Sequence, residues 1–299
     1  MAVLAPGIQL SASVQLVPAS RYTVAQLTAA YNQTRVDYLV PMPMNAARLA
    51  EYIHTYDVDL DASVVAVDAS ADGQILGLAM LGVRPGRSWI TRLGVLPASR
   101  RGGIGRALLQ ALLQTSDARA IPLNVLEVIK NNTPAYNLFI QCGFIARHEL
   151  LVLRRPPGPP ASAPAGRVEW LEGADALALL AGRADTPSWI TETESITRAG
   201  HVQALTLQLP DGGAGWLVFQ EQTFHGLPML LTRLTLRTLA GAPAEVGRAM
   251  LGHLYTRFPD LDTQAENVLE ADPHLPAFLD QGFVESFRRI EMHRFYGGC

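Results

Sequence analysis

The residues best suited to chemistry form a basic, glycine-rich segment, Arg-Arg-Gly-Gly-Ile-Gly-Arg, which runs from Arg100 to Arg106. It follows a strand-like stretch that ends at Pro97 and leads into an amphipathic, helix-like stretch. Backbone N–H groups in the first turn of a helix lack partners, and glycines let a phosphate approach them closely. Arginine adds charge-assisted hydrogen bonds, each contributing about 1.5–3 kcal/mol. The segment therefore predicts a site for a diphosphate, and we call residues 100–106 the cradle.

Two common phosphate-binding motifs do not fit the cradle. A P-loop ends in Gly-Lys-Ser/Thr, which is absent here. A Rossmann fingerprint places Gly-x-Gly-x-x-Gly after the first strand of a parallel unit, and no such pattern follows the first predicted strand.

The cradle and a later segment together resemble the GCN5-related N-acetyltransferases, the GNAT superfamily. The family has Gln/Arg-x-x-Gly-x-Gly/Ala after a strand, and further on Asn-x-x-Ala, an aromatic residue and Gly-Phe. The resemblance covers most of residues 8–155. The residues that carry it are Arg100, Gly103 and Gly105 in the first segment, and Asn132, Ala135, Phe139, Gly143 and Phe144 in the second.

This resemblance implies an acetyl-CoA site at a splay between two strands, predicted at residues 89–96 and 123–128. The first strand would pair with the pantetheine arm, the cradle amides would hold the pyrophosphate, and Asn132 would bond to the arm or the backbone near it. Acetyl-CoA would be a cosubstrate, and no metal is expected. The residues implied in cofactor binding are Leu93, Gly94, Val95, Arg100, Arg101, Gly102, Gly103, Ile104, Gly105, Arg106, Asn132, Ala135 and Phe139.

The catalytic acid and base do not follow the family pattern. Many members have a tyrosine, which protonates the departing thiolate, where this chain has Phe139. Tyr136 lies one helical turn earlier and is a candidate acid, with simple packing as the alternative. Glu127 is a candidate base or a structural residue, and His54 and Asp37 are further options on the acceptor side. GNAT chemistry can also rely mainly on proximity.

The acceptor pocket is expected from residues 31–56 and from the second half of the chain. Tyr31, Tyr38, Tyr56 and Trp89 are candidates to line it, although at least half of them are expected to be ordinary core.

The elements that must position these residues alternate along the first half of the chain. Short turns between apolar runs indicate an antiparallel meander, and longer amphipathic runs indicate helices. The expected class is α+β (α/β), with a mixed, mostly antiparallel twisted sheet flanked by helices. Strands are predicted at 8–17, 63–67, 75–81, 89–96, 123–128 and 145–153, and helices at 24–34, 45–56, 103–113 and 134–142.

A proline-rich stretch at 156–166 predicts a linker, because proline fixes φ and removes a hydrogen-bond donor. Beyond it the pattern repeats at separations of 139 to 142 residues, which predicts a tandem GNAT-like domain at 167–299 after a first domain at 1–155. The alternative is that turns fall at similar spacing in two unrelated α/β domains. The matched segments are 72–73 with 211–212, 86 with 226, 105–109 with 247–251, and 143–144 with 282–283.

The second copy is predicted to be degenerate. Residues 242–247, Ala-Pro-Ala-Glu-Val-Gly, stand where the cradle should be, without its basic pair or its central glycine. Glu245 would repel a phosphate, and Ala271 and His274 replace Asn132 and Ala135. We expect this copy to bind no CoA.

Composition narrows the classes of function. The net charge of −3 argues against a nucleic-acid partner, and the two cysteines, Cys142 and Cys299, form no metal or disulfide motif. The first basic residue is Arg21 and no apolar run approaches about 20 residues, so a cytoplasmic protein without a membrane partner is expected. The leading hypothesis is an N-acetyltransferase that moves an acetyl group from acetyl-CoA to an amine of a small molecule or peptide in a ternary complex, as a monomer or homodimer. The alternative is a non-catalytic acyl-CoA-binding sensor.

Overall fold

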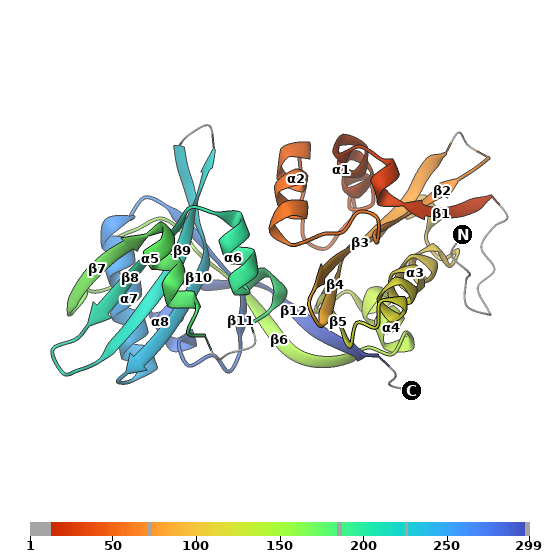
Figure 1. Cartoon of the computed structure of the whole chain (residues 1–299). Helices are drawn as coiled ribbons and strands as arrows, with labels where there is room; N and C mark the ends of the chain where they lie inside the picture. The colour runs from red at the N-terminus through yellow and green to blue at the C-terminus, as the bar shows by residue number, and fades with distance from the viewer. Residues whose placement is uncertain (1–12, 71–72, 184–186, 225–226, 297–299) are drawn as a thin grey trace. The chain divides into compact units, whose positions relative to one another are not determined.

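The computed structural model describes residues 13–70, 73–183, 187–224 and 227–296 of the chain. Two compact units divide it: unit 1 consists of Met1–Arg147 with Ile290–Cys299, and unit 2 of His148–Arg289. Both have a mostly antiparallel sheet with flanking helices, so the predicted fold class is confirmed (Figure 1). Positions 8–12 of the first predicted strand, positions 72 and 226 of the predicted repeat, and position 299 lie outside the described residues.

Unit 1 contains almost every predicted element of the first half. Its first four strands pair antiparallel in chain order, β4 pairs parallel with β5, and the end of β12 lies next to β5. The strands are β1 (Val14–Pro18), β2 (Val64–Asp68), β3 (Gln74–Arg84), β4 (Arg87–Val95), β5 (Leu123–Ile129) and the end of β12 (Val284–Phe295). The helices are α1 (Val24–Gln33), α2 (Ala46–Thr55), α3 (Ile104–Ala118) and α4 (Thr133–Gln141), with short 3-10 turns η1 (Ala19–Arg21) and η2 (Pro97–Ser99).

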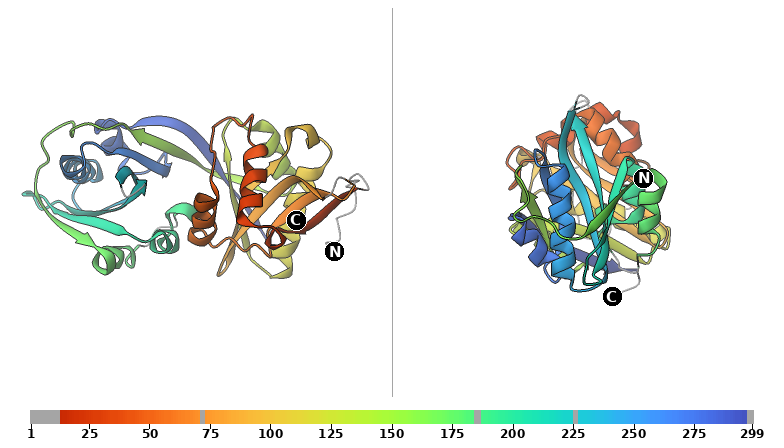
Figure 2. Two further views of the ribbon diagram at one scale, coloured as in Figure 1. Left: turned by 90° about the horizontal axis from the view of Figure 1, so that it is seen from above. Right: turned by 90° about the vertical axis from the view of Figure 1, so that its left-hand side faces the viewer.

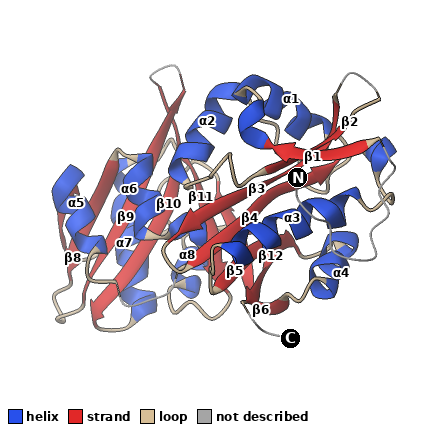
Figure 3. Cartoon of the chain, turned by 45° about the vertical axis from the view of Figure 1, so that its right-hand side comes forward, coloured by secondary structure: helices blue, strands red, loops and turns tan. Residues whose placement is uncertain are grey.

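The two faces of the unit 1 sheet carry different helices (Figure 3). Ile90 packs against Leu108 and Leu112 of α3. Its neighbour Trp89 points the other way, as alternation along a strand requires, and lies 6.0 Å from the ring of Tyr52 in α2. The strand β4 is therefore covered by α3 on one face and by α2 on the other.

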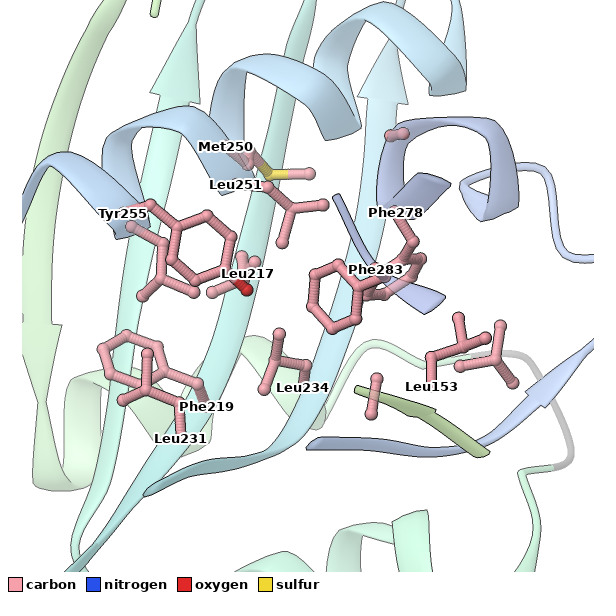
Figure 4. Packing of buried hydrophobic residues seen from close by; sticks show 14 of the residues in the cluster. Leu153, Leu217, Phe219, Leu231, Leu234, Met250, Leu251, Tyr255, Phe278 and Phe283 are labelled. Carbon is pink, nitrogen blue, oxygen red and sulfur yellow. The ribbon is translucent and has the colours of Figure 1, made fainter. Parts of the chain in front are cut away.

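Unit 2 has the same organisation. The strand order is β6-β11-β10-β9-β8-β7, with one parallel pair, β10 with β11. The large core cluster on one face includes Leu217 and Phe219 (Figure 4), while Trp216 and Val218 belong to a second cluster with residues of α5 and α6. The helix α7 lies on one side of this sheet, and α5 and α6 lie on the other (Figure 2). The strands are β6 (Ile145–Arg155), β7 (Arg167–Glu172), β8 (Val202–Gln208), β9 (Ala214–Phe224), β10 (Leu227–Ala240) and β11 (Asp262–Leu269). The helices are α5 (Gly173–Leu180), α6 (Thr193–Ala199), α7 (Pro243–Arg257) and α8 (Leu275–Asp280), with the 3-10 turn η3 (Trp189–Thr191).

The two units exchange strands, which places their boundaries elsewhere than the predicted 1–155 and 167–299. The second half of β6 pairs with β11, and Leu151 and Leu153 lie in the unit 2 core. Met292, near the end of β12, lies in the unit 1 core. Sequence periodicity predicts the first of these strands, at 145–153, but it does not report which core a strand enters.

The predicted linker at 156–166 has no helix or strand, but it is fastened to unit 2. The buried guanidinium of Arg155 donates to the carbonyls of Pro156, Gly158 and Pro159. The N–H of Ala161 donates to the side chain of Gln281. This stretch is therefore a bound segment of unit 2 and not a free spacer.

Backbone geometry supports the predicted repeat. Gly143 and Gly282 have φ of 87° and 86°, at the same turn after α4 and α8. Arg92 and Arg233 have φ of 53° and 52°, at matching points of β4 and β10, where non-glycine residues seldom adopt such values. Within the described ranges, no helix is long and apolar enough to cross a membrane, and no group of three or more His, Cys, Asp or Glu side chains is arranged for a metal ion.

Candidate acyl-CoA site

The predicted splay is present as a fork between β4 and β5. These strands pair only from Arg87 with Leu123 to Ile90 with Leu126. Beyond Ile90, β4 continues to Val95 paired with β3 alone, so its other edge is open.

A β-bulge sits where the fork opens. Arg92 has φ of 53°, and the register with β3 shifts by one residue at this point. The N–H of Leu96 donates to Leu76 at 2.8 Å, so alternation directs the N–H and C=O of Val95 and of Leu93 away from β3. The open edge therefore presents the backbone N–H groups of Leu93 and Val95, while their carbonyls accept from the guanidinium groups of Arg35 and Arg100. This is the edge expected to pair with an amide-bearing arm.

The cradle has the backbone geometry of an anion site. Arg101 and Gly103 have φ of 66° and 81°, and Gly103 is the N-cap of α3. No hydrogen bond in the described chain uses the backbone N–H groups of residues 101–106. Successive N–H groups in such a turn form a concavity that binds anions, and the helix dipole adds to it. This geometry suits a pyrophosphate, and binding of a pyrophosphate here stays a prediction.

Arg100 has a different role from Arg101. Its guanidinium donates to both carboxylate oxygens of Asp37 at 2.7 Å, and to the carbonyls of Thr34 and Val95 at 3.1 Å. The Arg100 guanidinium also holds the pKa of Asp37 below its usual value, which weakens Asp37 as a candidate base. The side chain thus anchors the cradle to the end of α1, and its predicted contact with phosphate stays a prediction.

The other cofactor residues have clear structural partners. Arg106 donates to the side chain of Gln141, which links α3 with α4. Asn132 caps α4 by accepting from the N–H of Ala135 at 3.3 Å. A Cβ on Gly94 would lie 2.4 Å from the hydroxyl of Thr34, so glycine allows α1 to approach β4. Their contacts with CoA stay predictions.

Phe139 belongs to the core. It is buried and meets Phe144 edge-on at 6.1 Å, as Phe278 meets Phe283 at 5.0 Å in unit 2. Tyr136 is half-buried against the same cluster, and its hydroxyl has no hydrogen bond in the described chain. Tyr136 therefore has an available proton donor, as its predicted role as acid requires.

The candidate bases differ in exposure. Glu127 is half-buried on β5, and its charge contributes to the environment of Tyr52. His54 is exposed on α2.

Burial is the main cause that raises the pKa of Tyr52 well above its usual value, so this hydroxyl stays protonated and bonds to Thr91 at 2.6 Å.

The predicted acceptor-side aromatics form one group, partly core. Tyr31 and Trp89 are buried, whereas Tyr38 and Tyr56 are half-buried. Sequence reasoning missed Arg35 and Arg92, whose guanidinium groups lie over tyrosine rings here, as well as Tyr52 and Thr91. The signals for the arginines were a Tyr-x-x-x-Arg spacing from Tyr31 to Arg35 and an arginine in the middle of β4.

Comparison with known proteins gives a consistent picture. Residues 28–144 match the family described as acetyltransferase (GNAT). No curated protein matches the sequence. A GCN5-related N-acetyltransferase from Sphaerobacter thermophilus is similar in structure, with a TM-score of 0.70, 14% identity, and coverage of 96% of this chain and 97% of that one.

Two further solved structures are similar over nearly the whole chain. A putative acetyltransferase from Pyrococcus horikoshii has a TM-score of 0.64 and 13% identity, covering 98% of this chain and 92% of that one. A tandem GNAT protein from the clavulanic acid biosynthesis pathway has a TM-score of 0.66 and 14% identity, covering 96% and 99%. Residues 28–144 therefore match the acetyltransferase (GNAT) family, and over nearly its full length the chain has a fold similar to that of a tandem GNAT protein.

Proposed function

We propose that this protein is an acetyl-CoA-dependent N-acetyltransferase that acts on an amine of a small molecule or peptide. The observation that carries the proposal is the row of unused backbone N–H groups at residues 101–106, directly beside the open edge of β4. An anion cradle next to an unpaired strand edge suits a ligand that has both a pyrophosphate and an extended amide-bearing arm.

Each part of the ligand has residues suited to it. The amides of 101–106, with the side chains of Arg101 and Arg106, would hold the pyrophosphate. The backbone groups of Leu93 and Val95 would pair with the arm, which runs from the cradle towards the bulge at Arg92. Strands rise about 3.3 Å per residue. An arm lying along β4 from Val95 to Leu93 would therefore bring the acyl end of the ligand to the opening of the fork.

Acetyl-CoA supplies an activated acetyl thioester at that point. The acceptor nitrogen attacks the carbonyl carbon, the C–N bond forms and the C–S bond breaks. An unperturbed alkylamine has a pKa of about 10.4, so a proton must leave before attack. We assign that proton to Glu127 or a water beside it. Tyr136 would protonate the departing sulfur, and the second proton, which the nitrogen releases as the C–N bond forms, would restore the Tyr136 hydroxyl. Holding both reactants in line supplies much of the acceleration.

A panel of amines with acetyl-CoA tests the proposal, with thiol release and the mass of the acetylated amine as readouts. Calorimetry with CoA on the same protein separates the rival function, a non-catalytic acyl-CoA-binding sensor, which buried Phe139 favours. Turnover of any amine supports the enzyme. CoA binding with no turnover across the panel supports the sensor, and absence of CoA binding contradicts both.

A further inference from the structure

Two arginines that the proposed reaction does not use flank Tyr31 on the α1–α2 side of β4. The guanidinium carbon of Arg35 lies 4.8 Å from the ring centre of Tyr31 and 4.5 Å from that of Tyr38. That of Arg92 lies 5.1 Å from Tyr31 and 4.0 Å from Tyr52. We call these five residues the arginine–tyrosine cluster.

The cluster is held in place at the open edge of β4. Arg35 donates to the carbonyl of Leu93 at 3.3 Å, and Arg92 donates to the hydroxyl of Tyr31 at 2.8 Å. Arg92 is also fixed by the bulge, where its positive φ sets the direction of its side chain. Both cations therefore lie at the end of the open edge where the acyl group is expected, on the face opposite α3.

The charge of Arg35 is not balanced by a carboxylate in the described chain. Asp37, two residues later, is bound by Arg100, and Asp57 is bound by Arg84 at 2.8 Å. The ion pairs among the described residues do not include Arg35, and its Nε is buried without a hydrogen-bond partner. A simple ammonium ion approaching this cluster would meet like charge at low dielectric, which disfavours it.

An acceptor that carries its own anionic group would be attracted to the arginines of this cluster. The guanidinium fork matches a carboxylate in shape and charge, and its bonds to one are stronger than neutral hydrogen bonds. A neighbouring carboxylate would also bring the amine to the fork in a fixed orientation. We propose that the acceptor is an amino carboxylic acid, whose carboxylate binds at the arginine–tyrosine cluster and whose amine faces the open edge of β4. This inference rests on the proposed acetyltransferase function.

Matched acceptor pairs test it with the full-length protein. Amino acids and their carboxamides differ only in the carboxylate, and phosphoethanolamine offers a different anion. We expect kcat/KM for the acids to exceed that for the carboxamides at least tenfold. Arg35→Gln should bring the acids down to the carboxamide level, with KM for acetyl-CoA within threefold of wild type. Arg48→Gln, at an exposed position on α2, is the matched control and should keep the preference.

The outcomes separate the two proposals. Equal rates for acids and carboxamides would overturn the carboxylate inference while the acetyltransferase function stands. A preference for phosphoethanolamine would overturn it as well, since the anion would then be a phosphate. If no amine were acetylated although acetyl-CoA bound, the proposed function itself would fail. Should Arg35→Gln not fold, Arg35→Lys, which keeps the charge but loses the fork, should show a reduced but measurable preference for acids.

Discussion

The N-termini of α3 and α7 are the same point of the repeat in two different chemical states. In unit 1, the N–H groups of residues 101–106 have no hydrogen-bond partners in the described chain. In unit 2, Pro243 has no N–H to offer, and the N–H groups of Glu245 and Val246 donate to Ala242 at 3.1 and 3.0 Å. One copy of the fold thus leaves its donors available for an anion, and the other consumes them locally.

The forks of the two units show the same contrast, because a side chain bridges the fork of unit 2 and not that of unit 1. In unit 2, β10 and β11 pair only at Leu230 with Asp262 and Leu231 with Thr263, so a fork remains. However, the buried ring of His274, at the start of α8, bonds to the hydroxyl of Thr238 on β10 at 3.0 Å. In unit 1 the matching position is Ala135, which has no polar side chain to form such a bridge. We propose that unit 2 binds no CoA, because α8 is tied to the strand along which the arm would lie.

A third difference is electrostatic. Arg106 faces the neutral side chain of Gln141, whereas its counterpart Arg248 is paired with Asp280. Gln141 and Asp280 occupy matching positions on α4 and α8. A cation that pairs with a carboxylate is already neutralised, so only Arg106 keeps its full charge for a phosphate.

The largest expected effect comes from a chain that ends at Arg155. Unit 1 would lose Met292 from its core and the bonds from Arg294 to both oxygens of Asp117, at 2.8 and 2.9 Å. It would also expose the Leu151 and Leu153 side chains that the unit 2 core buries. We expect aggregation, loss of the cooperative thermal transition and no CoA binding, measured by circular dichroism and calorimetry.

A chain ending at residue 296 is the control for this truncation and should keep its transition and its CoA binding. A soluble, fully active fragment 1–155 would show that unit 1 needs nothing from the C-terminal strand. The units would then be independent domains joined in series.

The next largest effect is expected at Gly103. A valine there must adopt φ of 81° at the N-cap of α3, between the N–H groups expected to hold the pyrophosphate, so CoA binding should be abolished. Gly73→Val is the matched control, because Gly73 has φ of 74° with no atom within 4 Å of an added Cβ. Both variants should lose comparable stability, and only Gly103→Val should lose CoA binding in calorimetry. Wild type should bind one CoA per chain, and two equivalent sites would contradict the asymmetry between the units.

Tyr136 marks a further contrast, because its counterpart in unit 2 is Leu275. If Tyr136 protonates the departing sulfur, Tyr136→Phe should lower kcat by about 10²–10⁴, the usual contribution of a positioned acid. Affinity for CoA should change little, since the ring and its packing remain. Steady-state kinetics with the best acceptor measures this, and a decrease below about threefold would leave Tyr136 a packing role only.

Much of the fold was readable from the sequence because its determinants are local. Turns such as the one at Gly86 and the apolar stripe of α3 set the elements of unit 1 within a few residues. The strand exchange was not readable, because a strand's pattern is the same whichever core it enters. In the site, the cradle followed from its glycines, but the bond between Arg100 and Asp37 joins residues 63 positions apart. The bulge at Arg92 was also hidden, because no glycine signals its positive φ.

A smaller effect on CoA affinity should distinguish Arg106 from Arg248, which occupy equivalent positions in the two units. Arg106→Gln removes one charge-assisted bond to phosphate, so affinity for CoA should fall by roughly 10–100-fold. Arg248→Gln, the equivalent change in unit 2, should leave CoA affinity within twofold, because that side chain pairs with Asp280. Titration of both variants at two salt concentrations checks the electrostatic origin. Equal losses in the two variants would mean that neither arginine acts through local contact with the ligand.

The smallest expected effect compares the glycines at the same place on α3 and α7. A Cβ on Gly105 would meet only Leu138 and Val95 at 3.7 Å, an ordinary contact distance. Alanine also favours the helix by about 0.8–1 kcal/mol, so Gly105→Ala should raise Tm by a few degrees, and it should weaken CoA binding far less than Gly103→Val does. A Cβ on Gly247 would lie 2.9 Å from that of Ala277, so Gly247→Ala should lower Tm because overpacking costs about 1–3 kcal/mol.

The two alanine variants are expected to change Tm in opposite directions because α7 and α8 approach each other more closely than α3 and α4 do. In unit 2, α7 and α8 touch at Gly247, which helps to close the fork, whereas in unit 1 the same position of α3 keeps its distance from α4. Thermal melts of both alanine variants, with and without CoA, measure this difference. A fall in Tm for both would mean that the fork of unit 1 is packed as tightly as that of unit 2. In that case the space assigned to the CoA arm would have to lie elsewhere on β4.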